Sequence, residues 1–185
     1  MSYLVSFLPW IAFAVVPSKQ WLLAALLGFG VGAVLLIRGF VAGRRIDMMV
    51  IEASAAIYFG LVALLALIDP TSPIQHYVPP MSDAWLTLTA LGSILVKRPF
   101  TMGIAKTQAP EHVWNTPRFY RINLVITSVW TAAFALTGLT LLLMPATGRL
   151  LIAVKVAGFV LPGLFTVWYV KRLRRGIPAQ EGQTA

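Results

Sequence analysis

The residue types from which catalytic sites and metal centres are built are scarce in this sequence and widely separated. It has two histidines, His76 and His112, six acidic residues and no cysteine. A Ser–His–Asp triad or a metal site needs such groups to converge, and a chain without cysteine has neither a thiolate nucleophile nor a Cys-type zinc site. The two histidines fall in polar segments that we assign to opposite sides of the molecule, and the acids are scattered. We therefore expect no enzymatic activity, no metal ion and no cofactor.

Two ionisable residues, Glu52 and Lys155, lie inside long apolar runs, where a charge is costly and often functional. Glu52 follows Met48, the start of its run, by four residues, and Lys155 follows Leu150 by five. At about 1.5 Å per residue they lie about 6 Å and about 8 Å from opposite faces of a core about 30 Å thick, so we expect no direct ion pair between them. Lys155 is predicted to face the bundle interior or a water-filled vestibule. Alternatively, its aliphatic stem extends outward and the residue has no functional role.

The longest polar interruption, residues 97–123, combines basic with aromatic side chains. Its candidate functional residues are Lys97, Arg98, Pro99, Trp114, Arg118, Arg121 and Asn123. Basic and aromatic residues interleaved in this way can bind a protein partner or the headgroups of anionic lipids. The same composition also suits a segment that only anchors the neighbouring spans at the membrane interface. The sequence leaves both interpretations open.

The composition as a whole predicts a membrane protein. Of the 185 residues, 58% are hydrophobic and 11% charged, and the mean hydropathy is +0.80, which is unlike a soluble domain. We predict an all-α, polytopic transmembrane helix bundle that forms one domain over residues 1–175, followed by a polar, disordered tail at 176–185. The five predicted full spans are residues 21–37, 48–68, 84–96, 124–144 and 150–170.

A shorter apolar stretch, residues 3–16, precedes the first full span. Its length of about 21 Å as a helix is less than a hydrocarbon core of about 30 Å, and Pro9 near its middle favours a break. It lacks the basic n-region of a signal peptide, so we expect it to be retained. The segment is either a re-entrant or interfacial helix or a strongly mismatched sixth span.

The distribution of lysine and arginine predicts the orientation of the spans. Twelve of the 15 lie in three segments, namely the loop after Ile37, residues 97–123 and the end of the chain after Val170. The opposite side has two, and one, Lys155, lies inside a span. By the positive-inside rule the three segments and the C-terminus face the cytoplasm. The net charge of +9 therefore reflects membrane orientation, and we expect no nucleic-acid partner.

Several short motifs are spread over nearly the whole chain. They are Phe7-Leu8-Pro9, Lys97-Arg98-Pro99, Val113-Trp114, a face formed by Trp130, Phe134 and Gly138, and Lys155-Val156-Ala157-Gly158. Trp130 is a further candidate functional residue. In these motifs the sequence resembles the intracellular septation protein A family of bacterial inner-membrane proteins. It departs from the family pattern near Asn123, which is further from Trp130, as if a helical turn were added.

The resemblance implies a multi-pass protein of the bacterial inner (cytoplasmic) membrane that is tied to cell division and envelope synthesis and is not an enzyme. On this hypothesis it acts through envelope or division proteins, or through anionic lipid at the cytoplasmic face. The alternative is a small transporter or channel with a pathway near Lys155 and the broken helices. A transporter should bring several intramembrane polar groups together at one depth, which separates the two hypotheses.

Overall fold

The computed structural model describes residues 3–143 and 149–175, which form helices and turns with no β-strand among them. The α-helices are α1 (Tyr3–Ser6), α2 (Leu8–Ala14), α3 (Trp21–Val41), α4 (Val50–Ile68), α5 (Val78–Leu95), α6 (Phe100–Lys106), α7 (Pro117–Leu143) and α8 (Arg149–Arg175). The 3-10 turns are η1 (Ser18–Gln20), η2 (Ile46–Met48), η3 (Pro73–His76) and η4 (Glu111–Val113). The predicted disordered tail lies outside the described residues.

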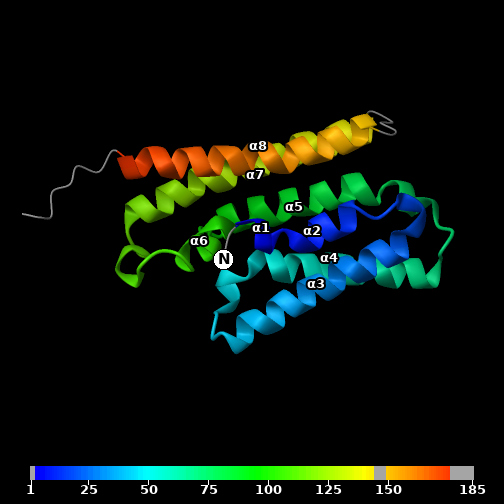
Figure 1. Ribbon diagram of the computed structural model, residues 1–185, viewed down its shortest axis with the longest axis horizontal. Coiled ribbons are helices and arrows are strands. Elements are labelled where there is room, and N and C mark those ends of the chain that lie inside the picture. The colour runs from blue at the N-terminus through cyan, green and yellow to red at the C-terminus, as the bar shows by residue number, and fades with distance from the viewer. Residues whose placement is uncertain (1–2, 144–148, 176–185) are drawn as a thin grey trace, which may run out of the picture.

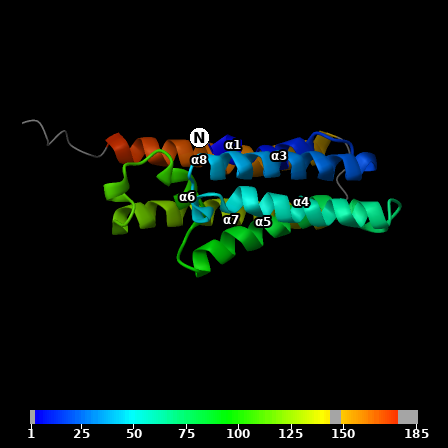
Figure 2. The ribbon, with the colours of Figure 1, turned by 90° about the horizontal axis from the view of Figure 1, so that it is seen from below.

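The long helices run roughly along one common axis and form two layers (Figures 1 and 2). One layer contains α8, the α1–α2 segment and α3, and the other contains α7, α5 and α4. Within and between the layers, α3 packs along α4, α5 along α7 and α7 along α8. The connection between α3 and α4 lies at the same end of the bundle as α6, which we call the α6 end. The opposite end, where η3 connects α4 to α5, is the η3 end.

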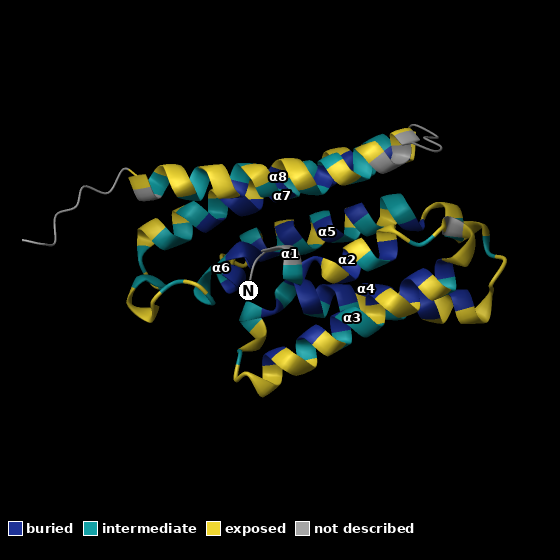
Figure 3. Ribbon diagram, viewed as in Figure 1, coloured by how far each residue is buried: buried dark blue, intermediate teal, exposed yellow. Residues whose placement is uncertain are grey.

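Four helices are long and apolar enough to cross a membrane: α3, α4, α7 and the Ala153–Leu173 part of α8. Much of their apolar surface points outward, and Leu67, Leu136 and Leu164 are each more than 60% exposed. Figure 3 shows such exposed residues along the outer sides of α3 and α8. An exterior this apolar marks a lipid-facing or interaction surface. The architecture is therefore consistent with a multi-pass membrane protein.

The all-helical prediction is confirmed, but several predicted boundaries differ from those of the structure. Four of the five predicted full spans coincide with the four long apolar helices, whereas the predicted span 84–96 belongs to the less apolar α5, which begins earlier, at Val78. Pro79 and Pro80 occupy the first turn of α5, where a missing backbone N–H costs little. Residues 97–123 are not one open loop, because they contain α6, η4 and the first turns of α7.

One face of the N-terminal segment is buried in the bundle, whereas Leu8, Ile11 and Val15 on its other face are exposed. Phe7 is 1% exposed and stacks on Trp130 of α7 with ring centroids 4.7 Å apart. At one end of the segment, Ser6 Oγ donates a hydrogen bond to Glu52 in the first turn of α4. After the segment and η1, Trp21 Nε1 at the start of α3 donates to the carbonyl oxygen of Pro70, just beyond the end of α4. Residues 6–21 together therefore extend along nearly the full length of α4.

Candidate functional site

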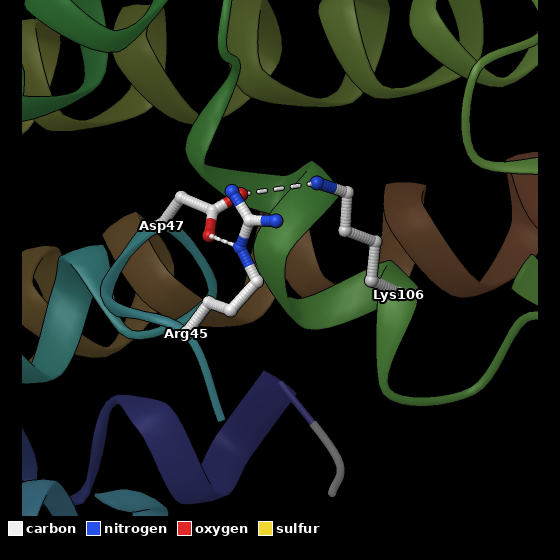
Figure 4. Close-up of polar contacts among 3 residues, drawn as sticks. All are labelled: Arg45, Asp47 and Lys106. Atoms are coloured by element: carbon white, nitrogen blue, oxygen red, sulfur yellow. Dashed lines mark hydrogen bonds and ion pairs between the residues drawn. The ribbon is translucent and has the colours of Figure 1, made fainter. Parts of the chain in front are cut away.

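Asp47, in η2, holds together two elements at the α6 end of the bundle. Its Oδ2 accepts a hydrogen bond from Lys106 Nζ of α6 and its Oδ1 accepts one from Arg45 Nε, both at 3.1 Å (Figure 4). Partial burial alone would raise the pKa of Asp47, but the hydrogen bonds and positive charges of Lys106 and Arg45 outweigh it and lower the pKa below 3.8. The carboxylate therefore ties the α3–α4 connection to α6.

A glycine allows α6 to come this close to η2. A Cβ added at Gly103 would lie 2.8 Å from the Asp47 carbonyl oxygen and 2.8 Å from Met48 Cα. Lys106 follows Gly103 by three residues and so lies on the same side of the helix. The other side of α6 is held to α7, since Thr101 Oγ1 donates to the Asn123 carbonyl oxygen at 3.0 Å.

Trp114 folds the segment after α6 back on itself. Its Nε1 donates to the carbonyl oxygen of Ala109 at 2.9 Å, and Lys106 Nζ lies 5.6 Å from the centroid of its ring, within the range of a cation–π interaction. The half-buried indole is thus part of the internal support of this segment. We call residues 97–121 the α6 platform.

Four basic side chains of the α6 platform are exposed: Lys97, Arg98, Arg118 and Arg121. Lys97 has a left-handed backbone with φ of 57° and ends α5 in a Schellman turn, in which the Lys97 and Arg98 N–H groups donate to the Ile94 and Ser93 carbonyl oxygens. Pro99 is buried and directly precedes α6. The backbone of this corner is therefore ordered while its charges face outward.

Asn123 and Trp130, also predicted as candidate functional residues, are buried in contacts between helices. Asn123 Nδ2 donates to the Phe119 carbonyl oxygen at 2.9 Å, and its buried Oδ1 has no partner among the described residues. Trp130 Nε1 donates to Thr166 Oγ1 of α8 at 3.0 Å, and its ring stacks on Phe7. The Trp130 side chain therefore joins α7 to α8 and to the N-terminal segment, whereas the Asn123 side chain bonds within α7.

Glu52 and Lys155 lie in separate surroundings. Glu52 is 4% exposed; its Oε1 accepts the 2.7 Å hydrogen bond from Ser6, whereas its Oε2 is buried without a partner in the described part of the chain. Lys155 is half-buried and lines a small recess together with Phe13 and Trp21, at the junction of the N-terminal segment and α3.

Asp83 is the charged residue that the sequence analysis missed. The predicted spans leave it between residues 68 and 84, outside the membrane, but it lies within α5 and is 5% exposed. Its charge interacts with that of Lys155, although the direct ion pairs found among the described residues are only those of Asp47. Two consecutive prolines followed closely by an acid could have indicated a helix start, because proline is favoured in the first turn.

Asp83 and Lys155 approach each other across α7. Asp83 packs against Gly138, where an added Cβ would lie 3.0 Å from the Asp83 Cβ. Gly158, nearly one turn beyond Lys155, packs against Thr137. The buried Tyr58 of α4 also interacts electrostatically with Asp83, and its hydroxyl donates to the Val78 carbonyl oxygen at 2.9 Å. Polar groups of four helices thus converge toward the η3 end.

The fold is all-helical over the described residues and consistent with membrane insertion. Its charged residues form one group at the α6 end and another, with Asp83 and Lys155, toward the η3 end. Within residues 3–143 and 149–175, no group of three or more His, Cys, Asp or Glu side chains could hold a metal ion. Comparisons with protein families, curated proteins and solved structures find no match to this chain. Its function is therefore inferred from the geometry above and from the distribution of charge.

Proposed function

We propose that the chain is a multi-pass protein of the bacterial inner membrane, akin to the intracellular septation protein A family. It supports envelope maintenance or septation by binding proteins and anionic lipid at the cytoplasmic face, without catalysis. The observation that carries the binding of proteins is the α6 platform. Asp47 and Gly103 hold its framework against the bundle, so its exposed basic side chains are presented from an ordered surface. Preorganisation of this kind lowers the entropy lost when a partner binds.

The proposed topology places the α6 end and the C-terminus in the cytoplasm. It is supported by the twelve basic residues of the three segments assigned to that side. We further propose six crossings, formed by the four long apolar helices, α5 and the N-terminal segment. The sixth crossing is supported by residues 6–21, the segment and the turn after it, which connect Glu52 in the first turn of α4 with Pro70 just beyond its end. The N-terminus is then cytoplasmic as well.

The proposal predicts that neutralising the α6 platform weakens the binding of cytoplasmic partners. The variant carries Lys97→Asn, Arg98→Gln, Arg118→Gln and Arg121→Gln; asparagine is used at position 97 because it tolerates the left-handed backbone. A photoreactive amino acid at the exposed Asn115 reports partner proteins by crosslinking in cells. We expect the crosslinked products to fall severalfold.

A matched variant removes four charges from other helices on the same side through Arg38→Gln, Lys171→Gln, Arg172→Gln and Arg175→Gln. It should retain the crosslinks, because it leaves the α6 platform intact. An equal loss in both variants would indicate general electrostatics, and unchanged crosslinks in the α6 platform variant would contradict the proposal.

The convergence of Asp83, Lys155, Tyr58 and Thr137 favours a second candidate, a small transporter. Charged and polar groups gathered inside a bundle are typical of substrate or proton pathways. Liposomes containing the purified protein and a pH-sensitive dye test this function. Proton flux that Asp83→Asn or Lys155→Met abolishes would favour transport. Absence of flux, with full cellular activity of Lys155→Met, would exclude a functional role of Lys155.

A further inference from the structure

The C-terminal part of α8 carries a second cationic cluster, separate from the α6 platform. Trp168, Lys171, Arg172 and Arg175 line one shallow hollow on this helix. Their spacing of three and four residues places them on one helical face. Arg172 Cζ lies 5.4 Å from the centroid of the Trp168 ring, and Trp168 is 52% exposed. The indole and the guanidinium therefore form one composite surface.

An apolar stripe leads directly into this cluster. Val160, Leu161, Leu164 and Val167 are exposed, whereas the opposite face of α8 packs on α7 through Gly158 and Thr166. Figure 3 shows the exposed bands along the outer side of α8. From Leu161 to Lys171 the helix rises about 15 Å, which is half of a hydrocarbon core of about 30 Å. Exposed apolar residues continue beyond Leu161 to Val156 and Leu150, so the stripe covers at least the depth of one leaflet and ends in an indole and three cations.

These cations have no acidic neighbours in the sequence. No Asp or Glu occurs between residues 112 and 180, so neither α7 nor α8 supplies a carboxylate to neutralise them. The C-terminal end of a helix carries partial negative charge, which stabilises basic residues there. An arginine guanidinium binds phosphate oxygens in a bidentate manner, and tryptophan prefers the depth of the headgroups.

We propose that this face of α8 is a binding site for one anionic phospholipid. Lys171, Arg172 and Arg175 bind its phosphate, the Trp168 indole contacts the glycerol region, and an acyl chain follows the apolar stripe. The proposal rests on the lipid interaction included in the proposed function, and it assigns that interaction to α8 rather than to the α6 platform. A lipid is favoured over a protein partner because the cations and the indole directly follow a long apolar stripe, as phosphate and glycerol follow an acyl chain.

Titration of the full-length protein in detergent with phosphatidylglycerol or phosphatidylcholine, read by native mass spectrometry, tests the site. In the triple variant Lys171→Gln, Arg172→Gln, Arg175→Gln we expect affinity for phosphatidylglycerol to fall by about a hundredfold, since each basic residue near an anionic surface contributes about fivefold. Affinity for phosphatidylcholine should stay low and unchanged. Unchanged melting temperatures would show that the fold is retained.

The matched control removes three charges from the α6 platform through Lys97→Asn, Arg98→Gln and Arg121→Gln, and it should keep the affinity for phosphatidylglycerol.

Two single substitutions test the chemistry of the site. Arg172→Lys should retain part of the affinity that Arg172→Gln loses, and Trp168→Leu should weaken binding severalfold without any change in charge. Loss in the control but not in the α8 variant would overturn the α8 site and leave the proposed function standing. Equal loss in both variants would indicate nonspecific attraction and would overturn the α8 site. Loss in neither variant would overturn the α8 site and also the lipid part of the proposed function.

Discussion

At the scale of single residues, the informative charges are those with specific partners. Asp47 accepts hydrogen bonds from Arg45 and Lys106 and so connects two segments that are far apart in the chain. Asp83 of α5 packs on Gly138 of α7, and Gly158, three residues beyond Lys155, packs on the adjacent Thr137. By contrast, Lys97, Arg98, Arg118 and Arg121 on the α6 platform and Lys171, Arg172 and Arg175 on α8 are exposed. The local environment of each charge therefore tells more about its structural role than its residue type does.

We predict that Asp47→Asn destabilises the protein at neutral pH by up to about 1 kcal/mol, the range of a partly exposed ion pair. Because the folded-state pKa lies below 3.8, the carboxylate stabilises the fold above that pH, and its contribution is lost as the pH falls through the folded-state value. Thermal unfolding in detergent at pH 7 and at pH 3 should show the difference from wild type shrinking in acid.

Glu111→Gln is the matched control for this measurement, because Glu111 is exposed. Its unfolding curve should follow the wild-type curve at both pH values. A deficit of Asp47→Asn that is equally large at pH 7 and pH 3 would mean that packing, rather than charge, accounts for the effect.

At the scale of elements, the position of α6 depends on one close backbone approach. In Gly103→Ala the new Cβ would collide with the backbone of Asp47 and Met48, and backbone atoms cannot rotate away as a side chain can. We expect a loss of about 1–3 kcal/mol, displacement of α6 and weakened binding of partners by the α6 platform. Thermal unfolding and crosslinking from Asn115 measure the two effects.

The control for this substitution is Gly92→Ala in α5, where an added Cβ has nothing within 4 Å. Alanine there should leave stability unchanged or raise it by up to about 1 kcal/mol, since glycine inside a helix is unfavourable. Equal behaviour of the two variants would contradict the importance of the close approach at Gly103.

At the scale of the whole molecule, the orientation in the membrane can be tested directly. We predict that reporter fusions after Arg45, after Gln108 and at the C-terminus report the cytoplasmic side, and that a fusion after His76 reports the opposite side. His76 is chosen because it is exposed in η3, before α5 begins. The expectation follows from the charge bias between the two ends of the bundle.

The fusions after His76 and Gln108 form the decisive pair, because α5 lies between them. If both report the same side, α5 does not cross the membrane and the proposed topology is wrong. In that case the shared basic charge of the α6 platform and of the C-terminal end of α8 would no longer show that the two lie on the same side of the membrane.

The sequence by itself determined the properties that depend on neighbouring residues. Long apolar runs predicted an all-helical chain, and basic residues at the ends of those runs predicted the topology, because helix formation and membrane partitioning depend on local composition. Helix starts were predicted less well. The first turns of α5 and α7 are polar or rich in proline, so hydropathy alone does not separate them from the preceding loops.

Only the tertiary structure decided which distant residues meet. It placed Phe7 of the N-terminal segment on Trp130 in the core, brought Lys106 to Asp47 and set Asp83 toward Lys155 across α7. These contacts join residues tens of positions apart, and they depend on close helix packing at Gly103, Gly138 and Gly158. The sequence shows that such glycines are present, but which surfaces they bring together follows from the packing of all the helices at once.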